Sequence, residues 1–525
     1  MRSKLITLFI LVLLTLSSCG SVVKYNTQIA KKHTPNELKK DIDYAYKKLK
    51  KLHPDLYLYT NKDSLDSYFN SLKSSIHKPL SSIEFYKSFA PIIAQIKQGH
   101  TTLSPPYKKQ TKKEKKEKGK KHNPFKSLRF ATLNNNIYID KNFGIDSTII
   151  VGSQLLKIDN ESVNNLTKSF KNIVTGDGYN KTFTPIAIRK YIGSLFIKTH
   201  GLKDSIAITL KKNDSIYTKY IYAIAKKVKQ IRKDTIVKKK RTKTEKKLAK
   251  KKLKSKKEFN FKYGYNNLTK EYTRNLKIIK QDSSSSIAYI KIRGFSNGGF
   301  KEFYKESFAK IDSTKSENLI IDLRNNGGGR LNEIAYLYSF LTDKDFIFIN
   351  KSKMTKSFAW YYPFMHNKSV LIKSASFLLL PVAKIVQLFK VKNINGVPHF
   401  KFGSAKLKKP SAINNFKGNV YVLINETSFS ASSILANNLK ANGAFLVGNE
   451  TGGANNSTVA GIFVPFELPN SKLKLRFGVT IIDTPHKDQP DGYGVIPNKF
   501  IKPTTLDNDE QLDWIINDIL KKDAK

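Results

Sequence analysis

The stretch Leu319–Arg330, which reads LIIDLRNNGGGR, decides the fold predicted for this 525-residue chain. Its first residues are apolar and β-branched, which is typical of a buried strand. Three glycines end the strand, because glycine there loses backbone entropy and offers no side chain to pack. Apolar residues then recur at helical spacing over 331–341. The order strand, glycine loop and helix predicts an α/β sheet with a ligand site at the carboxyl end of the strand, where backbone N–H groups can stabilise an anion. A tight turn that merely needs glycine is the alternative.

A second strand, turn and helix follow later in the chain. Residues 419–424 (NVYVLI) predict a strand, and residues 434–440 predict a helix. The segment between them, NETSFSASS, places serines at the start of this helix. A serine there has its hydroxyl above the sheet and near the positive end of a helix dipole, which suits a nucleophile. An ordinary N-cap is the alternative.

The other segments extend this α/β arrangement into an α+β multidomain chain. Hydrophobic periodicity and capping patterns indicate which segments are helices and which are strands. The expected helices cover 34–52, 65–76, 81–97 and 300–315, and the expected strands cover 137–139, 147–151, 205–210, 286–292 and 444–448.

Residues 152–163 (GSQLLKIDNESV) resemble the central stretch of PDZ domains, a strand pair joined by a polar turn. A PDZ-like subdomain would bind an extended chain by strand addition. A small β-subdomain without a ligand fits the pattern equally well. We therefore divide the chain into a signal peptide (1–18), a lipid-anchored tether (19–33), an N-terminal helical region (34–104), a basic linker (105–125), a PDZ-like β-subdomain (126–225), a Lys-rich insertion (226–260) and a catalytic domain (261–525) with its own insertion (351–415).

The net charge of +53, from 94 Lys and Arg against 41 Asp and Glu, is concentrated in blocks. The richest blocks are residues 107–122 and 226–257. Such runs are typical of solvated, flexible arms that adhere to anionic lipid, lipopolysaccharide or nucleic acid without sequence preference. They contain no recognition module or interleaved aromatic residues, so we expect no specific nucleic-acid partner.

The N-terminus has the pattern of a secretory signal. A basic start precedes the apolar run Leu5–Leu16, which is too short for a comfortable transmembrane span. The sequence LSSC that follows resembles the lipobox of bacterial lipoproteins, which implies cleavage before Cys19 and a lipid anchor on its sulfur. An ordinary signal peptide with an incidental cysteine is the alternative. Since Cys19 is the only cysteine, we expect no disulfide in the mature fold.

The insertion 351–415 contains one long apolar segment, residues 377–389 (FLLLPVAKIVQLF). Its length fits a buried or interfacial helix better than a membrane span. A lid helix, a membrane-surface helix, a dimer contact and ordinary core packing all remain open.

Four motifs in order resemble those of the C-terminal-processing (tail-specific) serine peptidases. They are LIIDLRNNGGG, VYVLINETSFSAS, FLVGNETGG and GYGVIPN. The resemblance extends from Thr34 to Leu520, with the Lys-rich blocks and 351–415 as insertions. It implies a ClpP/crotonase-like catalytic core with an N-terminal helical part and a PDZ-like β-subdomain.

The resemblance also implies the residues of the site. Ser430 matches the nucleophile of the family. The backbone N–H of Ala431, with that of Gly327 or Gly328, would form the oxyanion hole.

Two branches of the family activate the serine differently. One uses a lysine at the position of Ala454, and no lysine is near it here. The branch similar to the tricorn core protease uses a histidine, which matches His100, and a carboxylate, which matches Asp491. The implied mechanism is a triad in which His100 is the general base and acid and Asp491 orients its imidazole.

Three residues depart from the family pattern: Gln98, Ser433 and Asn498. None of them would attack the substrate or transfer a proton. Together they favour, as an alternative, a catalytically impaired relative that binds peptides without hydrolysing them. A Lys-rich, membrane-associated structural protein is a second alternative.

The sequence therefore predicts a serine endopeptidase that cleaves unfolded polypeptides or C-terminal tails through an acyl-enzyme, without a metal or other cofactor. We expect it in the bacterial cell envelope, held by its lipid anchor. The start Gly20-Ser21 lacks an acidic surface-export signature, which favours the periplasmic side of the outer membrane. The sequence does not indicate an oligomeric state.

Overall fold

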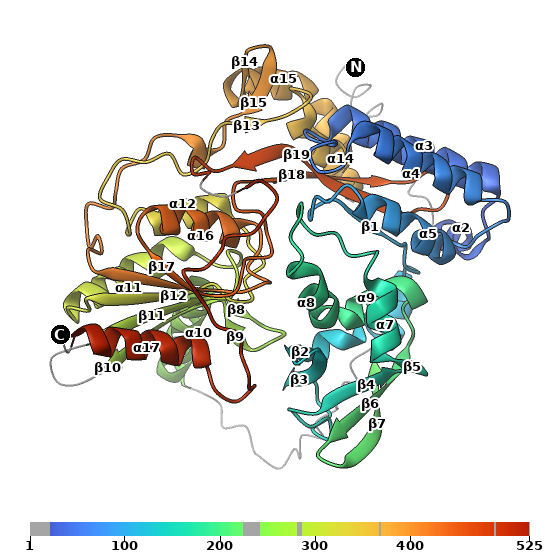
Figure 1. The fold of residues 1–525 in the computed structure, drawn as a ribbon. Coiled ribbons are helices and arrows are strands. Elements are labelled where there is room, and N and C mark those ends of the chain that lie inside the picture. Colours follow the sequence, from blue (N-terminus) through green and yellow to red (C-terminus); the bar gives the residue numbers. More distant parts are fainter. Residues whose placement is uncertain (1–21, 224–241, 281–285, 367–368, 488–489, 524–525) are drawn as a thin grey trace.

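A central sheet of six strands organises the computed structural model, which describes residues 22–223, 242–280, 286–366, 369–487 and 490–523 (Figure 1). The predicted signal peptide and Cys19 lie outside the described residues. The sheet has the order β10-β11-β12-β16-β17-β20 and is parallel except where β10 pairs with β11. Its strands are β10 (Arg274–Lys280), β11 (Ser286–Ile292), β12 (Asn318–Asp322), β16 (Asn419–Ile424), β17 (Phe445–Gly448) and β20 (Lys499–Phe500).

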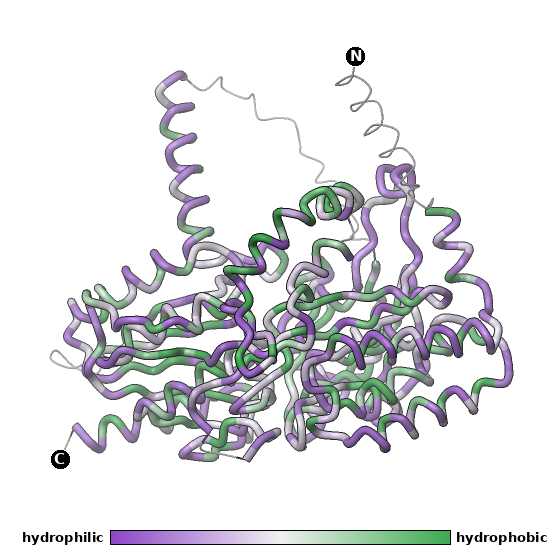
Figure 2. Tube along the Cα trace, turned by 90° about the horizontal axis from the view of Figure 1, so that it is seen from above, coloured by the Kyte–Doolittle hydropathy of each residue, from purple (hydrophilic) through white to green (hydrophobic). Residues whose placement is uncertain are grey.

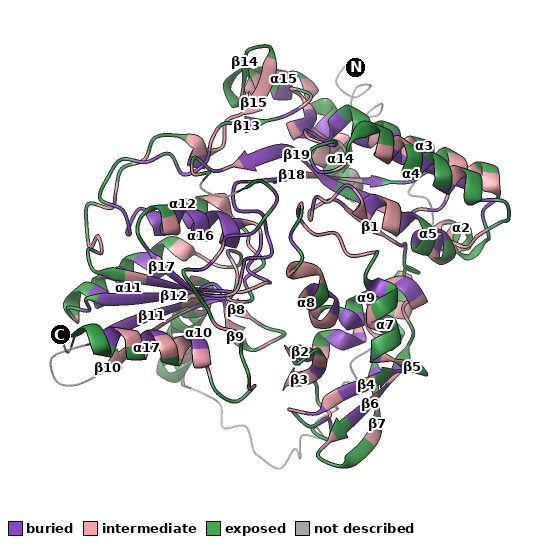
Figure 3. Ribbon diagram, in the orientation of Figure 1, coloured by how far each residue is buried: buried purple, intermediate pink, exposed green. Residues whose placement is uncertain are grey.

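Helices cover both faces of this sheet. One face packs against α11 (Phe300–Ser313), α12 (Leu331–Tyr338) and α16 (Ala431–Ala441), and the other against α17 (Glu510–Asp523). All five residues of β12 are buried, which explains the apolar run 319–321 at its centre (Figure 3). The predicted α/β core is confirmed.

A long hairpin connects this core to the N-terminal helices. Strands β18 (Ser457–Glu467) and β19 (Lys474–Asp483) pair with each other, and β1 (Thr102–Ser104) adds to the edge of β19. Apolar side chains of the hairpin share one core with the N-terminal helices. These helices are α2 (Val22–Ala30), α3 (Pro35–Leu52), α4 (Lys62–Ser75) and α5 (Ser82–Ala94).

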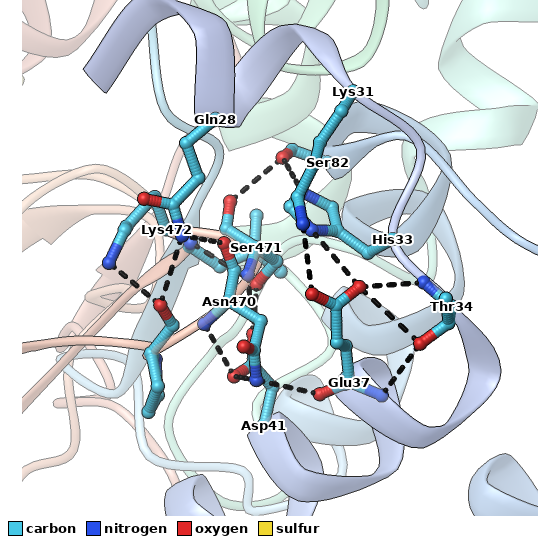
Figure 4. A network of polar contacts seen from close by, with 12 residues as sticks. Gln28, Lys31, His33, Thr34, Glu37, Asp41, Ser82, Asn470, Ser471 and Lys472 are labelled. Atoms are coloured by element: carbon cyan, nitrogen blue, oxygen red, sulfur yellow. Dashed lines mark hydrogen bonds and ion pairs between the residues drawn. The ribbon is translucent and has the colours of Figure 1, made fainter. Parts of the chain in front are cut away.

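A buried polar network attaches the N-terminal helices to the tip of the hairpin (Figure 4). The carboxylate of Asp41 on α3 is fully buried and accepts hydrogen bonds from the backbone N–H groups of Asn470 (2.9 Å) and Ser471 (2.7 Å). The Ser82 hydroxyl on α5 donates to the Ser471 carbonyl at 2.8 Å. Buried hydrogen bonds to a charged group contribute strongly to stability, so this network fixes how the helices sit on the hairpin.

Residues 128–222 form the β-subdomain, a sheet of order β2-β3-β4-β6-β7 in which β5 pairs with β4. The pairing of β4 with β5 confirms the predicted strand pair within 152–163. The strands are β2 (Leu128–Leu133), β3 (Asn136–Asn142), β4 (Gln154–Ile158), β5 (Glu161–Ser162), β6 (Ser205–Lys212) and β7 (Ser215–Tyr222), and the helices are α7 (Val163–Phe170), α8 (Phe183–Lys190) and α9 (Ile192–His200).

The strand predicted at 147–151 is wrong, because this segment is a turn. The Asp146 carboxylate accepts hydrogen bonds from the backbone N–H and the hydroxyl of Thr148. Such local side-chain bonds compete with strand pairing.

Three segments predicted as tether, linker or flexible arm contain helices. They are α2 in the tether, α6 (Lys112–Lys118) in the basic linker and α10 (Lys243–Tyr263) in the Lys-rich insertion. Capping boxes begin α6 and α10, and lysine is a good helix former. No residue of α10 is buried, so the insertion is solvated as expected but helical rather than irregular over this range.

The insertion 351–415 carries a bent pair of exposed apolar helices. Helices α14 (Val370–Leu378) and α15 (Leu380–Lys390) meet at 75°. Figure 2 shows this pair as a largely hydrophobic segment at the surface. Within the described residues no single helix is long and apolar enough to cross a membrane, and only this bent pair passes that test by length and composition. The other elements of the insertion are β13 (Ser352–Lys353), α13 (Tyr362–Met365), β14 (Val391–Ile394) and β15 (Val397–Phe400).

Candidate active site

Ser430 lies in a strained turn between β16 and α16. Its backbone has φ +58° and ψ −121°, a conformation that costs a non-glycine residue about 1–3 kcal/mol. The turn directs the residue to the N-terminus of α16, the positive end of the helix dipole. The turn requires glycine at position 453. A Cβ on Gly453 would lie 2.7 Å from the Ser430 nitrogen, which is too close. A strained serine between strand and helix is the geometry of an exposed nucleophile.

His100 is the hydrogen-bond partner of Ser430. Its Nε2 lies 3.0 Å from the Ser430 Oγ, although the two residues are 330 positions apart in the chain. The imidazole packs between the rings of Phe429 (5.3 Å) and Phe463 (5.2 Å). Burial, and secondly the charge of Arg476, lower the pKa of His100 to about 4. His100 is therefore neutral at physiological pH and able to accept the hydroxyl proton.

The motif RNNGGG supports the nucleophile turn through its asparagines. The amide of Asn326 is fully buried; its Nδ2 donates to the Ile292 carbonyl, and its backbone carbonyl accepts the N–H of Phe429 at 3.0 Å. The Asn326 Oδ1 accepts the N–H of Gly328 at 2.9 Å. A Cβ on Gly328 would lie 2.8 Å from the Ala431 nitrogen, so only glycine fits beside the serine.

An ion pair holds the start of the same motif. The guanidinium of Arg324 binds the buried carboxylate of Asp322 at 2.9 Å and reaches Asp509 before α17. Burial alone would raise the pKa of Asp322, but Arg324 outweighs it and holds this pKa well below its usual range. Arg324 thus stabilises the loop and takes no part in the reaction.

Two backbone N–H groups beside Ser430 suit an oxyanion hole. Ala431 is the first residue of α16, where an N–H has no partner within the helix. Of the two predicted glycines, Gly328 already donates its N–H to Asn326. Among the described residues the Gly327 N–H has no acceptor, and Gly327 lines the cleft that contains Ser430. Among the described residues, Ala431 and Gly327 are therefore the donors beside Ser430 that are available to an incoming carbonyl oxygen.

Asp491 is not brought to His100. Its side chain is exposed, and no hydrogen bond joins it to the imidazole in the described part of the chain. The reason is the packing of Gly492, whose carbonyl accepts the Tyr179 N–H at 2.8 Å and whose Cα lies against Gly178. The structure therefore shows a Ser–His pair, not the predicted triad.

A carboxylate that sequence reasoning missed binds the backbone of the residue before His100. Asp177, in the loop before α8, accepts the N–H groups of Gly99 (2.6 Å) and Ala454 (3.2 Å). Burial raises the pKa of Asp177 to about 6, and the two hydrogen bonds oppose this rise. Asp177 fixes the residue directly before His100. Its position between Gly176 and Gly178 is the only signal in the sequence that another segment approaches closely here.

Lys190, at the end of α8, connects the β-subdomain to both loops of the site. Its Nζ donates to the side chains of Asn325 and Thr427, each at 3.0 Å. Burial, with the charge of Arg129, lowers the pKa of Lys190 to about 8. Sequence reasoning did not select this lysine, because its partners lie more than 130 residues away.

The three residues that depart from the family pattern have structural roles here. The Ser433 hydroxyl donates to the Ser428 carbonyl at 3.2 Å, and the Asn498 Oδ1 accepts the Leu446 N–H at 2.9 Å. Gln98 is buried, and its backbone carbonyl accepts the Thr101 N–H in the bend that carries His100. None of the three removes a group from the Ser–His pair.

No metal-binding group was found in the part of the chain that the structure describes. There, no cluster of three or more His, Cys, Asp or Glu side chains could hold a metal ion.

A strained serine, a histidine on its hydroxyl and two backbone N–H groups beside it define a serine hydrolase site. Residues 286–499 match the family model of peptidase family S41, and this range contains Ser430 and the glycines at 327–329 and 452–453. This part of the chain is thus similar to family S41 peptidases, and the protein is a serine peptidase, as the four motifs predicted. No curated protein sequence matches the chain.

Solved structures with the same fold span nearly the whole chain. The structure of mature CPAF complexed with lactacystin is 14% identical with a TM-score of 0.54, and the similarity covers 89% of this chain and 94% of that one. Mature CPAF alone is 15% identical with a TM-score of 0.53, and covers 89% and 92%. At these identities the likeness establishes a shared fold, including the helical N-terminal part and the β-subdomain.

Proposed function

We propose that this serine peptidase cleaves polypeptides in unfolded segments or C-terminal tails while attached to a membrane of the bacterial cell envelope. The observation that carries the peptidase activity is the 3.0 Å contact between the His100 Nε2 and the strained Ser430 hydroxyl. A C-terminal-tail substrate is supported by the resemblance of the four motifs to those of the C-terminal-processing peptidases.

The geometry supports acyl-enzyme chemistry. The Ser430 Oγ attacks the substrate carbonyl carbon while its proton moves to the His100 Nε2. The negative charge that develops on the carbonyl oxygen is held by the N–H groups of Ala431 and Gly327. His100 then gives the proton to the leaving amine as the C–N bond breaks. Water, deprotonated by His100, attacks the acyl carbon, and His100 returns this proton to the Ser430 Oγ as the ester bond breaks.

A second candidate is a peptide-binding relative without hydrolysis. The observation that favours it is the lack of a carboxylate on His100 among the described residues, since such a group orients the imidazole in a full triad. This candidate needs the cleft and the β-subdomain but not the Ser–His contact.

Labelling with a fluorophosphonate probe separates the two candidates. We expect a covalent adduct on Ser430, mapped by mass spectrometry, that is absent from Ser430→Ala and from His100→Ala. An adduct that survives His100→Ala would exclude His100 as the base. No adduct on folded wild-type protein would establish the binding relative instead.

Membrane attachment is supported by the apolar pair α14–α15. Exposed large side chains cover both helices, and Leu371, Leu378, Leu388 and Phe389 are each more than 70% exposed. The charged residues of the pair are all lysines, and lysine beside exposed apolar surface is typical of helices that lie on anionic membranes. Helix α2 contacts the turn between β18 and β19, and α13, which precedes the pair, contacts β18. The pair and the first described residues therefore lie near the same hairpin. The lipobox-like sequence before Cys19 supports the same attachment and, with it, a location on the outer membrane facing the periplasm.

Flotation with vesicles tests this attachment. A chain starting at residue 22 should float with vesicles that contain phosphatidylglycerol, and Phe389→Glu should lower the bound fraction by about tenfold. Leu407→Glu is the matched control, because Leu407 is equally exposed but lies outside the helix pair. Equal flotation of Phe389→Glu and wild type would contradict the proposed surface.

A further inference from the structure

We infer that the catalytic cleft contains a carboxylate-binding site centred on Arg476, so that its substrates carry an acidic side chain or a free C-terminal carboxylate close to the scissile bond. The inference rests on the proposed peptidase function and deepens it by naming a class of substrate.

The charges that line the cleft are of one sign. The cavity has a volume of about 1330 Å³ and contains both Ser430 and His100. Among its described lining residues there is no Asp or Glu. The cationic lining residues are Lys301, Arg330, Lys408, Lys409 and Arg476. A cleft lined by one sign of charge attracts ligands of the opposite charge.

These cations differ in whether the protein already neutralises them. Arg330 binds the buried carboxylate of Glu333 at 2.6 Å, so its charge is already neutralised within the protein. No ion pair with a described Asp or Glu joins Lys301, Lys408, Lys409 or Arg476. In the cleft, the charge available to a ligand therefore comes from these four side chains.

Arg476 is the one held beside the reacting groups. It lies on β19 opposite Thr102 of β1, the short strand that follows His100. Its guanidinium carbon lies 3.8 Å from the centre of the Phe463 ring, and the His100 ring lies 5.2 Å from the same ring. A guanidinium stacked on an aromatic ring is fixed in orientation while the N–H donors at its edge remain free to bind a carboxylate.

Binding of a carboxylate to Arg476 also affects the base. Among the described residues, Arg476 supplies the charge that acts on His100, whereas the buried Asp177 binds the backbone of Gly99. Burial, and then the Arg476 charge, lower the pKa of His100. A substrate carboxylate on Arg476 offsets the second cause, so it raises the pKa of His100 and makes it a stronger base. A substrate with the matching charge would thus be both positioned and better activated for cleavage.

Binding to Ser430→Ala protein tests the site without requiring hydrolysis. A fluorescein-labelled peptide, chosen from the cleavage sites mapped in denatured casein or, failing cleavage, from an acidic casein segment, is made with a free C-terminal carboxyl and acidic side chains. Its fully amidated counterpart has the same sequence with Asn, Gln and a C-terminal amide. We expect the amidated peptide to bind more weakly by a factor on the order of 10 to 100, the worth of a hydrogen bond to a charged group. Adding Arg476→Gln to Ser430→Ala should remove most of this difference.

Two further peptides, one with only acidic side chains and one with only the C-terminal carboxylate, show which of the two carboxylates binds Arg476. If the loss of affinity follows replacement of Asp and Glu, the ligand is a side chain; if it follows the C-terminal amide, the ligand is the chain terminus. Lys305→Gln is the control for net charge, because Lys305 on α11 is exposed and does not line the cleft. Equal binding of all four peptides, or an unchanged preference in Arg476→Gln, would overturn the inference.

The pH profile of kcat gives a readout that a purely structural role would not move. For wild-type protein, the acidic limb should lie at higher pH with the carboxylate peptide than with the amide. For Arg476→Gln the two limbs should coincide, and Arg476→Lys should restore part of the separation. Failure of the peptidase itself would appear separately, as absence of the fluorophosphonate adduct on Ser430 in a protein that still distinguishes the peptides.

Discussion

The two sides of the active site are built in different ways. The nucleophile side comes from one αβ core, where the loops after β12 and β16 bond each other through buried groups such as Asn326. The base side is delivered from outside this core: β1 places His100 on β19, and Asp177 of the β-subdomain fixes Gly99.

The nucleophile side therefore depends on contacts within one domain, whereas the base side depends on how the domains pack against one another. The contacts that hold the nucleophile side lie within the central sheet and its loops. The base reaches the 3.0 Å contact with Ser430 only when the N-terminal helices sit on the hairpin and the β-subdomain sits on the core. A change in docking far from the cleft should therefore reduce activity without altering the serine.

The largest expected effect is on the nucleophile side. Ser430→Ala should lower kcat/KM by a factor on the order of 10⁶, because no other group can form the acyl-enzyme. Hydrolysis of a casein-derived peptide measures the loss. Ser430→Gly should be as inactive yet more stable than Ser430→Ala by about 1 kcal/mol in urea unfolding, because glycine relieves the positive φ.

Asp491→Asn is the counterpart on the base side. Because Asp491 is exposed and does not touch His100, kcat/KM should stay within about twofold of wild type. A fall of about 100-fold or more would re-establish the predicted triad and contradict the arrangement seen here.

The next effect tests docking at a distance. Asp41→Ala should destabilise the protein by about 3 kcal/mol, since it leaves the buried N–H groups of Asn470 and Ser471 without an acceptor. Urea unfolding measures this, and activity should fall as His100 moves.

The matched control for Asp41 lies two residues away on the same helix. Asp43 is exposed, and among the described residues its ion pair is with Lys73, so Asp43→Ala should cost about 1 kcal/mol or less. Equal losses for the two variants would show that the buried network does not hold the N-terminal helices.

A smaller effect is expected at Asp177 and depends on pH. Its pKa in the folded state, about 6, is above its ordinary value, so the stability it contributes is complete below pH 4 and is lost as the pH rises through about 6. The difference in Tm between wild type and Asp177→Asn should therefore change over this window and be constant above about pH 7. Activity of the variant should fall by about tenfold, because an amide cannot accept from both Gly99 and Ala454. A difference in Tm that is independent of pH would contradict this assignment.

A further moderate loss of activity is expected where the β-subdomain meets the site. Lys190→Met should lower kcat/KM by about threefold to tenfold, because two hydrogen bonds to the loops are lost. Wild-type activity should decline as Lys190 loses its proton near pH 8, and the variant should lack this decline. Lys181→Met, at an exposed lysine of the same segment, is the control. If the pH profiles of Lys190→Met and wild type have identical alkaline limbs, Lys190 has no role in the activity.

How much the sequence predicts differs between the two sides for a physical reason. The strands and glycine loops of the core follow from local patterns, because a buried parallel strand must be apolar and only glycine fits against Ser430. The strand, turn and helix around Ser430 follow from these patterns, whereas its role and those of Ala431 and of Gly327 or Gly328 were implied by the resemblance of the motifs. The same reasoning misplaced the strand at 147–151 and treated α10 as irregular, because local bonds and caps outweighed the overall composition.

The sequence by itself determined the αβ core, the nucleophile turn and the choice of His100 as partner through its motif. Only the tertiary structure decided which carboxylate holds the bend that carries His100: Asp177 binds Gly99, whereas Asp491 remains exposed. It also brought Lys190 and Arg476 to the site from separate domains. Contacts between segments hundreds of residues apart depend on how whole domains dock, and no local pattern of residue types records that packing.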